Sequence, residues 1–122
     1  MVEYFRNQPG IDKTRMAVVG YSYGAMVGFA AGMLDPGIKV LVGISPPIGA
    51  FRMEFMSRII HPLLVITGDK DMFCPLDKLR PLLPAGAKLE LVKGADHLYR
   101  GHEIEAGKLV AAFLMEKIGH SS

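Results

Sequence analysis

One serine, two aspartates and one histidine in this sequence have the chemistry that nucleophilic catalysis needs. Ser22 lies in Gly-Tyr-Ser-Tyr-Gly, residues 20–24, directly after an apolar run and before helix-forming residues. A Gly-x-Ser-x-Gly sequence at a strand-to-helix junction places its serine on a sharp, strained turn that exposes the hydroxyl. We expect a side chain at Gly20 or Gly24 to collide with the main chain there. An ordinary glycine-containing turn fits the pentapeptide alone equally well.

A serine hydroxyl attacks poorly unless a base takes its proton. His97 supplies an imidazole, the side chain that serves most often as such a base. Asp69 and Asp71 follow the apolar run Leu63–Thr67 and supply carboxylates that would orient the imidazole. Nucleophile, acid and base thus follow one another in the order Ser, Asp, His.

The elements expected around these residues alternate between strands and helices. Such alternation predicts an α/β fold with a parallel sheet, whose strands all present their carboxyl ends at one edge. Ser22 follows the first predicted strand, both aspartates follow the third and His97 follows the fourth. We therefore expect them to meet at that edge. The expected strands are Met16–Val19, Lys39–Ile44, Leu63–Thr67 and Lys88–Val92; the expected helices are Val2–Asn7 (its last turns), Gly24–Leu34, Phe51–Ile60, Pro75–Leu83 and His102–Ile118.

Three motifs in this order resemble those of the α/β-hydrolases. They are the pentapeptide at 20–24, Gly-Asp-Lys-Asp at 68–71 and Gly-Ala-Asp-His at 94–97. The chain is similar to the carboxyl-terminal half of that family, most of all to its small esterase-like and dienelactone-hydrolase-like members. The resemblance implies a three-layer αβα architecture with a mostly parallel sheet of about four strands. We expect residues 1–122 to form one domain, which the resemblance marks as a truncated one.

The resemblance also assigns roles. Ser22 would be the nucleophile, His97 the base and Asp71 the acid, with Asp69 as the alternative acid. The backbone N–H of Tyr23 would donate to the oxyanion. The implied reaction is hydrolysis of a small carboxylic ester or thioester through an acyl-serine intermediate. A peptidase of the prolyl-oligopeptidase kind is disfavoured, because its motif usually carries another glycine where this chain has Ala25.

Two parts of the family's pattern are missing from the sequence. It contains no His-Gly-Gly-Gly segment to supply a second oxyanion donor, and the strands that normally precede the serine's strand are absent. We therefore expect either self-association or pairing of a missing amino-terminal half with the strand Met16–Val19. The alternative function is a catalytically weak or inactive hydrolase-like fragment that acts as a self-associating or binding module.

The composition of the chain argues against several other classes of function. The chain has 122 residues and a net charge of +2, and its basic residues are scattered, which argues against nucleic-acid binding. No apolar run approaches the roughly 20 residues of a membrane helix, and the start does not resemble a signal peptide. With a single cysteine, we expect a cytoplasmic protein. The spacing of His61, His102 and His120 does not suggest a metal site, so we expect neither metal nor cofactor.

Other residues near these motifs have simpler interpretations. We interpret Ser45 as a strand-end turn residue rather than a substrate ligand. Cys74 is expected to be a buried, inert thiol, with a place in the wall of the site as the alternative. The apolar stripe Phe51–Ile60 indicates a helix that faces the core. In a second interpretation, Met53 and Met56 form a flexible wall for an acyl chain.

Overall fold

A computed structural model describes residues 2–5 and 16–117 of the chain. Its centre is one sheet of five strands in the order β1-β2-β3-β4-β5. Strands β2 to β5 run parallel, and β1 pairs with β2 in the antiparallel direction. The predicted α/β class and mostly parallel sheet are therefore confirmed. The strand bounds are β1 Val2–Phe5, β2 Met16–Tyr21, β3 Ile38–Ile44, β4 Leu63–Gly68 and β5 Lys88–Val92.

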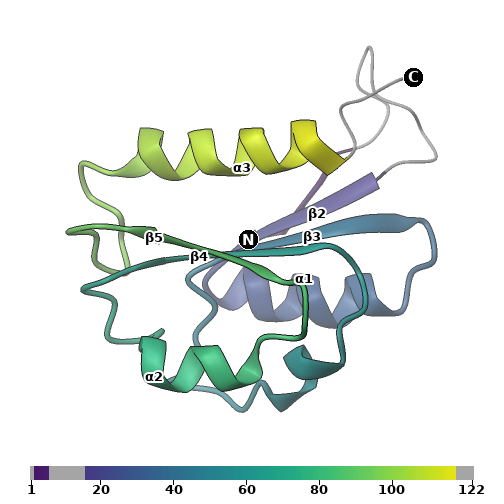
Figure 1. Cartoon of the computed structure of the whole chain (residues 1–122), viewed down its shortest axis with the longest axis horizontal. Coiled ribbons are helices and arrows are strands. Elements are labelled where there is room, and N and C mark those ends of the chain that lie inside the picture. Colours follow the sequence, from purple (N-terminus) through teal and green to yellow (C-terminus); the bar gives the residue numbers. More distant parts are fainter. Residues whose placement is uncertain (1, 6–15, 118–122) are drawn as a thin grey trace.

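Helices cover both faces of this sheet, which gives three layers (Figure 1). Helix α3 lies on one face, and α1, α2 and two 3₁₀ turns, η1 and η2, lie on the other. The connection between two parallel strands is nearly always a right-handed crossover that runs over a face of the sheet. This explains why the helices between successive strands lie on the sheet's faces. The bounds are α1 Tyr23–Met33, η1 Glu54–Arg58, α2 Leu76–Leu79, η2 Arg80–Leu82 and α3 Glu103–Lys117.

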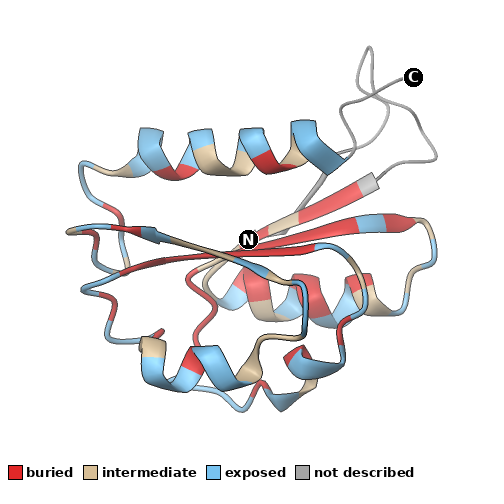
Figure 2. Ribbon diagram, in the orientation of Figure 1, coloured by how far each residue is buried: buried red, intermediate tan, exposed pale blue. Residues whose placement is uncertain are grey.

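Apolar side chains bury the central strands on both faces. Every residue of β4 is buried, and Lys39 is the one exposed residue of β3. Continuous apolar runs of this kind are typical of parallel strands that are covered on both sides. Figure 2 shows the same contrast between buried strands and helices that bury only their inner stripes. One core cluster includes Val18, Phe29 and Leu41; the other includes Val42, Ile66 and Phe113.

The first element is a strand and not the end of a helix, so that prediction was wrong. Val2–Phe5 pairs with β2, with Val2 opposite Gly20 and Phe5 opposite Ala17. Four residues are too few to show a helical period, and the β-branched and aromatic members suit a strand once a neighbour offers hydrogen bonds. The rest of the predicted helix, residues 6–7, lies outside the described residues. Since β1 covers the edge of β2, that edge no longer supplies a reason for self-association, which stays a prediction.

The stripe Phe51–Ile60 was predicted as a helix, and this was also wrong. The structure has only the 3₁₀ turn η1 in this segment. The buried residues of the segment 51–60 are Met53, Met56 and Ile59. Their spacing of three residues matches the three residues per turn of a 3₁₀ helix. The two methionines belong to the core and do not form a wall over a pocket. Phe51 and Ile60 are exposed instead.

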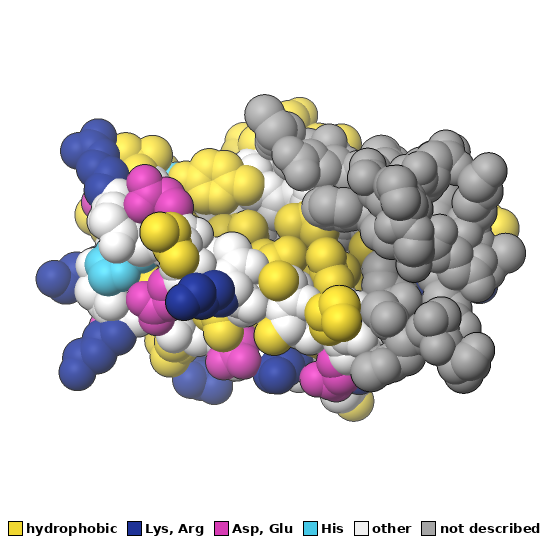
Figure 3. All heavy atoms as spheres, turned by 90° about the horizontal axis from the view of Figure 1, so that it is seen from above, with side chains coloured by type: hydrophobic (Ala, Val, Ile, Leu, Met, Phe, Trp, Pro, Cys, Tyr) yellow, Lys and Arg dark blue, Asp and Glu magenta, His cyan; other side chains and the backbone are white. Residues whose placement is uncertain are grey.

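Smaller differences concern the last two helices. The predicted helix Pro75–Leu83 is divided into α2 and η2, while α3 covers the predicted carboxyl-terminal helix up to Lys117. Within residues 2–5 and 16–117, no helix has both the length and the apolar character to cross a membrane. Viewed from above onto the α3 side, charged side chains lie at the left end and along the lower edge, and hydrophobic ones lie toward the middle (Figure 3).

Candidate active site

Ser22 lies between β2 and α1 on a strained turn. Its backbone has φ 56° and ψ −123°, in the left-handed half of conformational space where non-glycine residues are rare. The Ser22 N–H donates to the carbonyl of Ile44 (2.8 Å), and its own carbonyl accepts from Ala25 N–H (2.8 Å). A Cβ on Gly20 would lie 2.4 Å from the carbonyl oxygen of Gly24. The turn therefore requires glycine at position 20 and holds the serine in one orientation.

The structure brings Ser22, His97 and Asp71 together in a chain of hydrogen bonds. Ser22 Oγ lies 2.7 Å from His97 Nε2, and His97 Nδ1 lies 2.9 Å and 3.0 Å from the two carboxylate oxygens of Asp71. With its proton on Nδ1, the imidazole donates to Asp71 and leaves Nε2 free to accept from the serine hydroxyl. The Asp71 side chain is 0% exposed, whereas that of His97 is 17% exposed. The carboxylate is thus shielded from water, and the imidazole still reaches the surface.

The two candidate acids make different contacts. Besides His97, Asp71 accepts a hydrogen bond from Phe73 N–H (2.9 Å), which fixes the carboxylate. Asp69 is exposed and accepts from Gly94 N–H (2.7 Å), so it joins the turn after β4 to the turn after β5. A Cβ on Gly68 would lie 2.1 Å from the carbonyl oxygen of Ala95, which shows how closely these two turns approach. The geometry favours Asp71 over Asp69 as the partner of His97.

Tyr21 contacts His97 in a way that the sequence did not indicate. Its hydroxyl donates to the backbone carbonyl of His97, and the two ring centroids lie 5.7 Å apart. Burial, and then the negative charges of Asp71 and Asp96, raise the pKa of the Tyr21 phenol, so it stays protonated and able to donate. The only sequence signal was an aromatic residue next to the serine at the end of a strand.

Ser45 and Tyr99 form a second, buried pair beneath the site. Their hydroxyl oxygens lie 2.7 Å apart, and both residues have positive φ, 50° for Ser45 and 57° for Tyr99. The Tyr99 hydroxyl also lies 3.4 Å from the carbonyl of Ile66. Burial is the main cause that raises the pKa of Tyr99 well above its ordinary value. The prediction that Ser45 is a strand-end turn residue agrees with these contacts.

Tyr23 opens α1 next to the serine. As the first residue of the helix, its N–H has no acceptor within that helix, and among the described residues none accepts a hydrogen bond from it. The Tyr23 side chain is exposed and packs edge-on against Phe51, with ring centroids 5.7 Å apart. A free donor and an apolar surface therefore lie beside Ser22.

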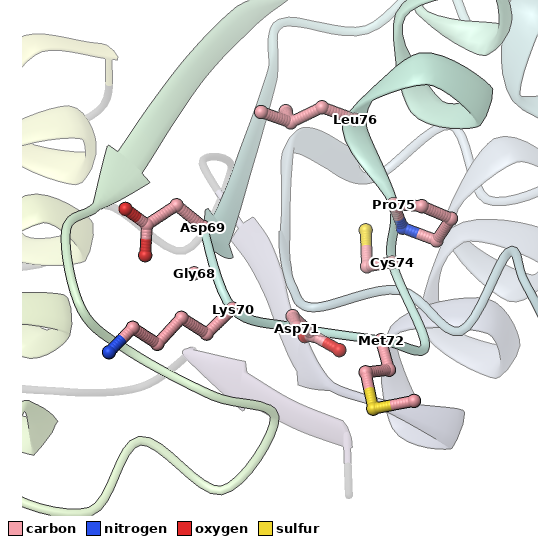
Figure 4. A pocket seen from close by; sticks show the side chains of 8 residues that line it. All are labelled: Gly68, Asp69, Lys70, Asp71, Met72, Cys74, Pro75 and Leu76. Atoms are coloured by element: carbon pink, nitrogen blue, oxygen red, sulfur yellow. The ribbon is translucent and has the colours of Figure 1, made fainter.

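Two hollows open at the ends of β4 and β5. One, of about 310 Å³, is lined by residues 68–72 and 74–76; in Figure 4, the side chains of Asp69 and Lys70 point away from Cys74 and Pro75. The other, of about 210 Å³, adjoins His97. Cys74 is buried in the wall of the first, and burial raises its thiol pKa to about 11, in agreement with an inert thiol. In the part of the chain that the structure describes, there is no group of His, Cys, Asp or Glu side chains suited to a metal ion.

Comparisons with known proteins show which fold this chain shares with them. No protein-family model matches the chain. It is similar to the structure of an α/β serine hydrolase without a lid from Xanthomonas campestris (24% identity, TM-score 0.69, covering 85% of this chain and 48% of that one). It is also similar to a protein of unknown function from Agrobacterium tumefaciens, proposed to be an α/β hydrolase (24% identity, TM-score 0.76, covering 84% and 50%).

A curated relative, an uncharacterized protein of Rickettsia prowazekii, is 25% identical and is matched over 80% of this chain and 46% of its own length. The chain thus spans about half the length of the proteins it matches. The chain has the α/β-hydrolase fold, in the extent of its carboxyl-terminal half.

Proposed function

We propose that this chain carries the catalytic triad of a serine hydrolase, which cleaves a small carboxylic ester or thioester. The observation that carries the proposal is the continuous chain from Ser22 Oγ through both nitrogens of His97 to a buried Asp71. A plain turn serine does not need an imidazole as its hydrogen-bond partner and a shielded carboxylate behind that imidazole.

The reaction begins when Ser22 Oγ attacks the carbonyl carbon of the substrate and its proton passes to His97 Nε2. A carbon–oxygen bond forms, and the carbonyl oxygen becomes an oxyanion. Asp71, hydrogen-bonded to Nδ1, keeps the imidazole in the required tautomer and stabilises the imidazolium. When the tetrahedral intermediate collapses, the bond to the alcohol or thiol breaks and His97 gives its proton to that leaving group. Water then repeats the sequence and releases the acid.

The free N–H of Tyr23 supports its assignment as one oxyanion donor. It lies at the amino end of α1, where the helix dipole favours negative charge. A second donor is not assigned to any residue of this chain. Because losing one donor costs on the order of 10²- to 10³-fold in turnover, we expect the isolated chain to be a slow enzyme.

A fluorophosphonate probe tests the proposal without requiring fast turnover. The probe should phosphonylate Ser22 in the folded chain, and a Ser22→Ala variant of the same stability should remain unlabelled. A panel of p-nitrophenyl esters would then define the preferred acyl length. Folded protein that is never labelled at Ser22 would instead favour the alternative function, a binding module. The observation behind this alternative is that the chain matches only about half the length of its relatives.

A further inference from the structure

The hollow of about 210 Å³ beside His97 is lined by Lys70, Met72, Phe73, Asp96, His97 and Leu98. It is smaller than the roughly 300–1,000 Å³ of pockets that enclose a whole ligand, so its size suits one substituent of a substrate. We propose that this hollow binds the leaving group of the substrate, and that the leaving group it takes is an uncharged apolar or aromatic alcohol. This inference rests on the proposed function, because it assigns His97 its role at the leaving oxygen.

The position of the hollow follows from the geometry of the reaction. In the tetrahedral intermediate, the oxyanion faces the Tyr23 N–H and the leaving oxygen must face His97 Nε2, which protonates it. A substituent on the leaving oxygen therefore extends along the imidazole. His97 is one of the residues that line the hollow, whereas neither Tyr23 nor Phe51 lines it. The acyl substituent consequently has a different surface available, next to the Tyr23–Phe51 pair.

The chemistry of the hollow comes from three apolar side chains that are unusually open to solvent. Met72 is 87% exposed, Phe73 is 51% exposed and Leu98 is 54% exposed. The Phe73 ring lies 4.8 Å from that of His97, at 54°, so the apolar surface begins directly at the imidazole. Covering such surface removes it from water, which favours an apolar occupant.

Main-chain hydrogen bonds hold both walls of the hollow. Phe73 N–H donates to Asp71, and the Phe73 carbonyl accepts from Gly49 N–H (2.9 Å). Across the hollow, Asp96 accepts from the N–H groups of Leu98 (3.0 Å) and Tyr99 (3.1 Å). The walls are therefore set before any substrate arrives, which lowers the entropic cost of binding.

The two charged residues of the lining do not select an ionic substituent. Lys70 and Asp96 carry opposite charges, and the Asp96 carboxylate is occupied by two N–H donors. A leaving group with a charge of either sign would meet a repelling partner as well as an attracting one. The apolar side chains remain as the selecting feature.

Leu98→Ala is the informative variant, because it removes apolar surface and leaves the main-chain hydrogen bonds intact. Leu34→Ala is the matched control, since Leu34 is an exposed leucine at the far end of α1. The substrates are benzyl acetate and methyl acetate, which share one acyl group and have unactivated alcohols. We expect kcat/KM for benzyl acetate, divided by kcat/KM for methyl acetate, to fall about tenfold in Leu98→Ala, because a few methylenes of an apolar pocket contribute about this much to discrimination. The same ratio should stay unchanged in Leu34→Ala.

A binding measurement separates this inference from the catalytic proposal. Benzyl alcohol at millimolar concentration, added to Ser22→Ala protein, should shift the NMR signals of the Leu98 methyl groups and the His97 ring, and Leu98→Ala should abolish the His97 shift. If benzyl alcohol leaves both signals unmoved, or if Ser22 is labelled by fluorophosphonate yet the ester ratio is unchanged in Leu98→Ala, the leaving-group site is refuted. Shifts without any Ser22 labelling would refute catalysis and retain the apolar site.

Discussion

Two neighbouring strands of this protein are each followed by a serine with nearly the same positive φ. Ser22 follows β2 with φ 56°, and Ser45 follows β3 with φ 50°. Each N–H donates to a carbonyl of the next strand, Ser22 to Ile44 at 2.8 Å and Ser45 to Ile66 at 2.7 Å. Each hydroxyl has a hydrogen-bond partner at 2.7 Å. Backbone strain and hydrogen-bond length therefore do not distinguish a candidate nucleophile from a structural serine.

The two serines differ in the hydrogen-bond partner of the hydroxyl and in whether a substrate can reach it. The partner of Ser22 is an imidazole whose Nε2 can accept a proton, and behind it stands a carboxylate. The partner of Ser45 is the phenol of Tyr99, whose pKa is raised by burial, so it keeps its own proton. Ser45 is also 0% exposed, so no substrate reaches it. A serine needs a basic partner and an open face before it can attack.

The strongest test of this comparison replaces each serine with alanine. Ser22→Ala should lower ester hydrolysis by on the order of 10⁴- to 10⁶-fold, the range seen when the nucleophile of a triad is removed. Ser45→Ala should still react with fluorophosphonate at Ser22, because it leaves the hydrogen bonds of His97 in place. Labelling of Ser22→Ala protein at Ser45 would show that the buried serine is reactive after all.

The second test compares the two aspartates after β4. Asp71→Asn should lower turnover by about 10⁴-fold, because the amide favours the wrong imidazole tautomer. Asp69→Asn should leave turnover nearly unchanged and cost at most about 1–3 kcal/mol of stability through its contact with Gly94. Ester hydrolysis and thermal unfolding, measured on both variants, would assign the acid. Equal losses of turnover would contradict the assignment of Asp71.

Much of this arrangement was predictable from the sequence, because the strands are nearly uninterrupted apolar runs and parallel strands bring their ends to one edge. Which aspartate meets His97 was less certain, since two acids lie within three residues and only the fold of the turn separates them. The pairing of Ser45 with Tyr99 and the contact of Tyr21 with His97 join residues far apart in sequence. No periodicity or motif encodes such contacts, so they required the structure.

The third test concerns the buried pair. Ser45→Ala or Tyr99→Phe should each cost about 1–3 kcal/mol in the free energy of unfolding, because each leaves a buried hydroxyl or its partner with fewer hydrogen bonds. The double variant should cost less than the sum, since it removes both polar groups at once. Urea unfolding of the four proteins measures this directly. Full additivity would show that the two hydroxyls contribute independently.

Tyr99 should also make stability fall at alkaline pH. The unfolded phenol loses its proton near pH 10, while the folded one, with its raised pKa, keeps it. Above pH 10 the unfolded state therefore binds fewer protons, so the free energy of unfolding falls as pH rises; below pH 10 the contribution is fully present. Tyr99→Phe should flatten this decline in urea unfolding between pH 9 and 11. A decline identical to that of the parent protein would assign the effect to other groups.

The smallest effect on activity is predicted for a substitution of Tyr21, which lies between the partners of the two serines. The centroid of its ring is 5.7 Å from that of His97 and 6.2 Å from that of Tyr99. Tyr21→Phe keeps the rings packed and removes the hydroxyl that donates to the His97 carbonyl. Losing one hydrogen bond of about 1 kcal/mol should lower kcat roughly fivefold, with KM little changed. Because the hydroxyl acts on the histidine turn and not on substrate, the loss should fall on kcat. A rise in KM at constant kcat would mean that Tyr21 contributes to substrate binding.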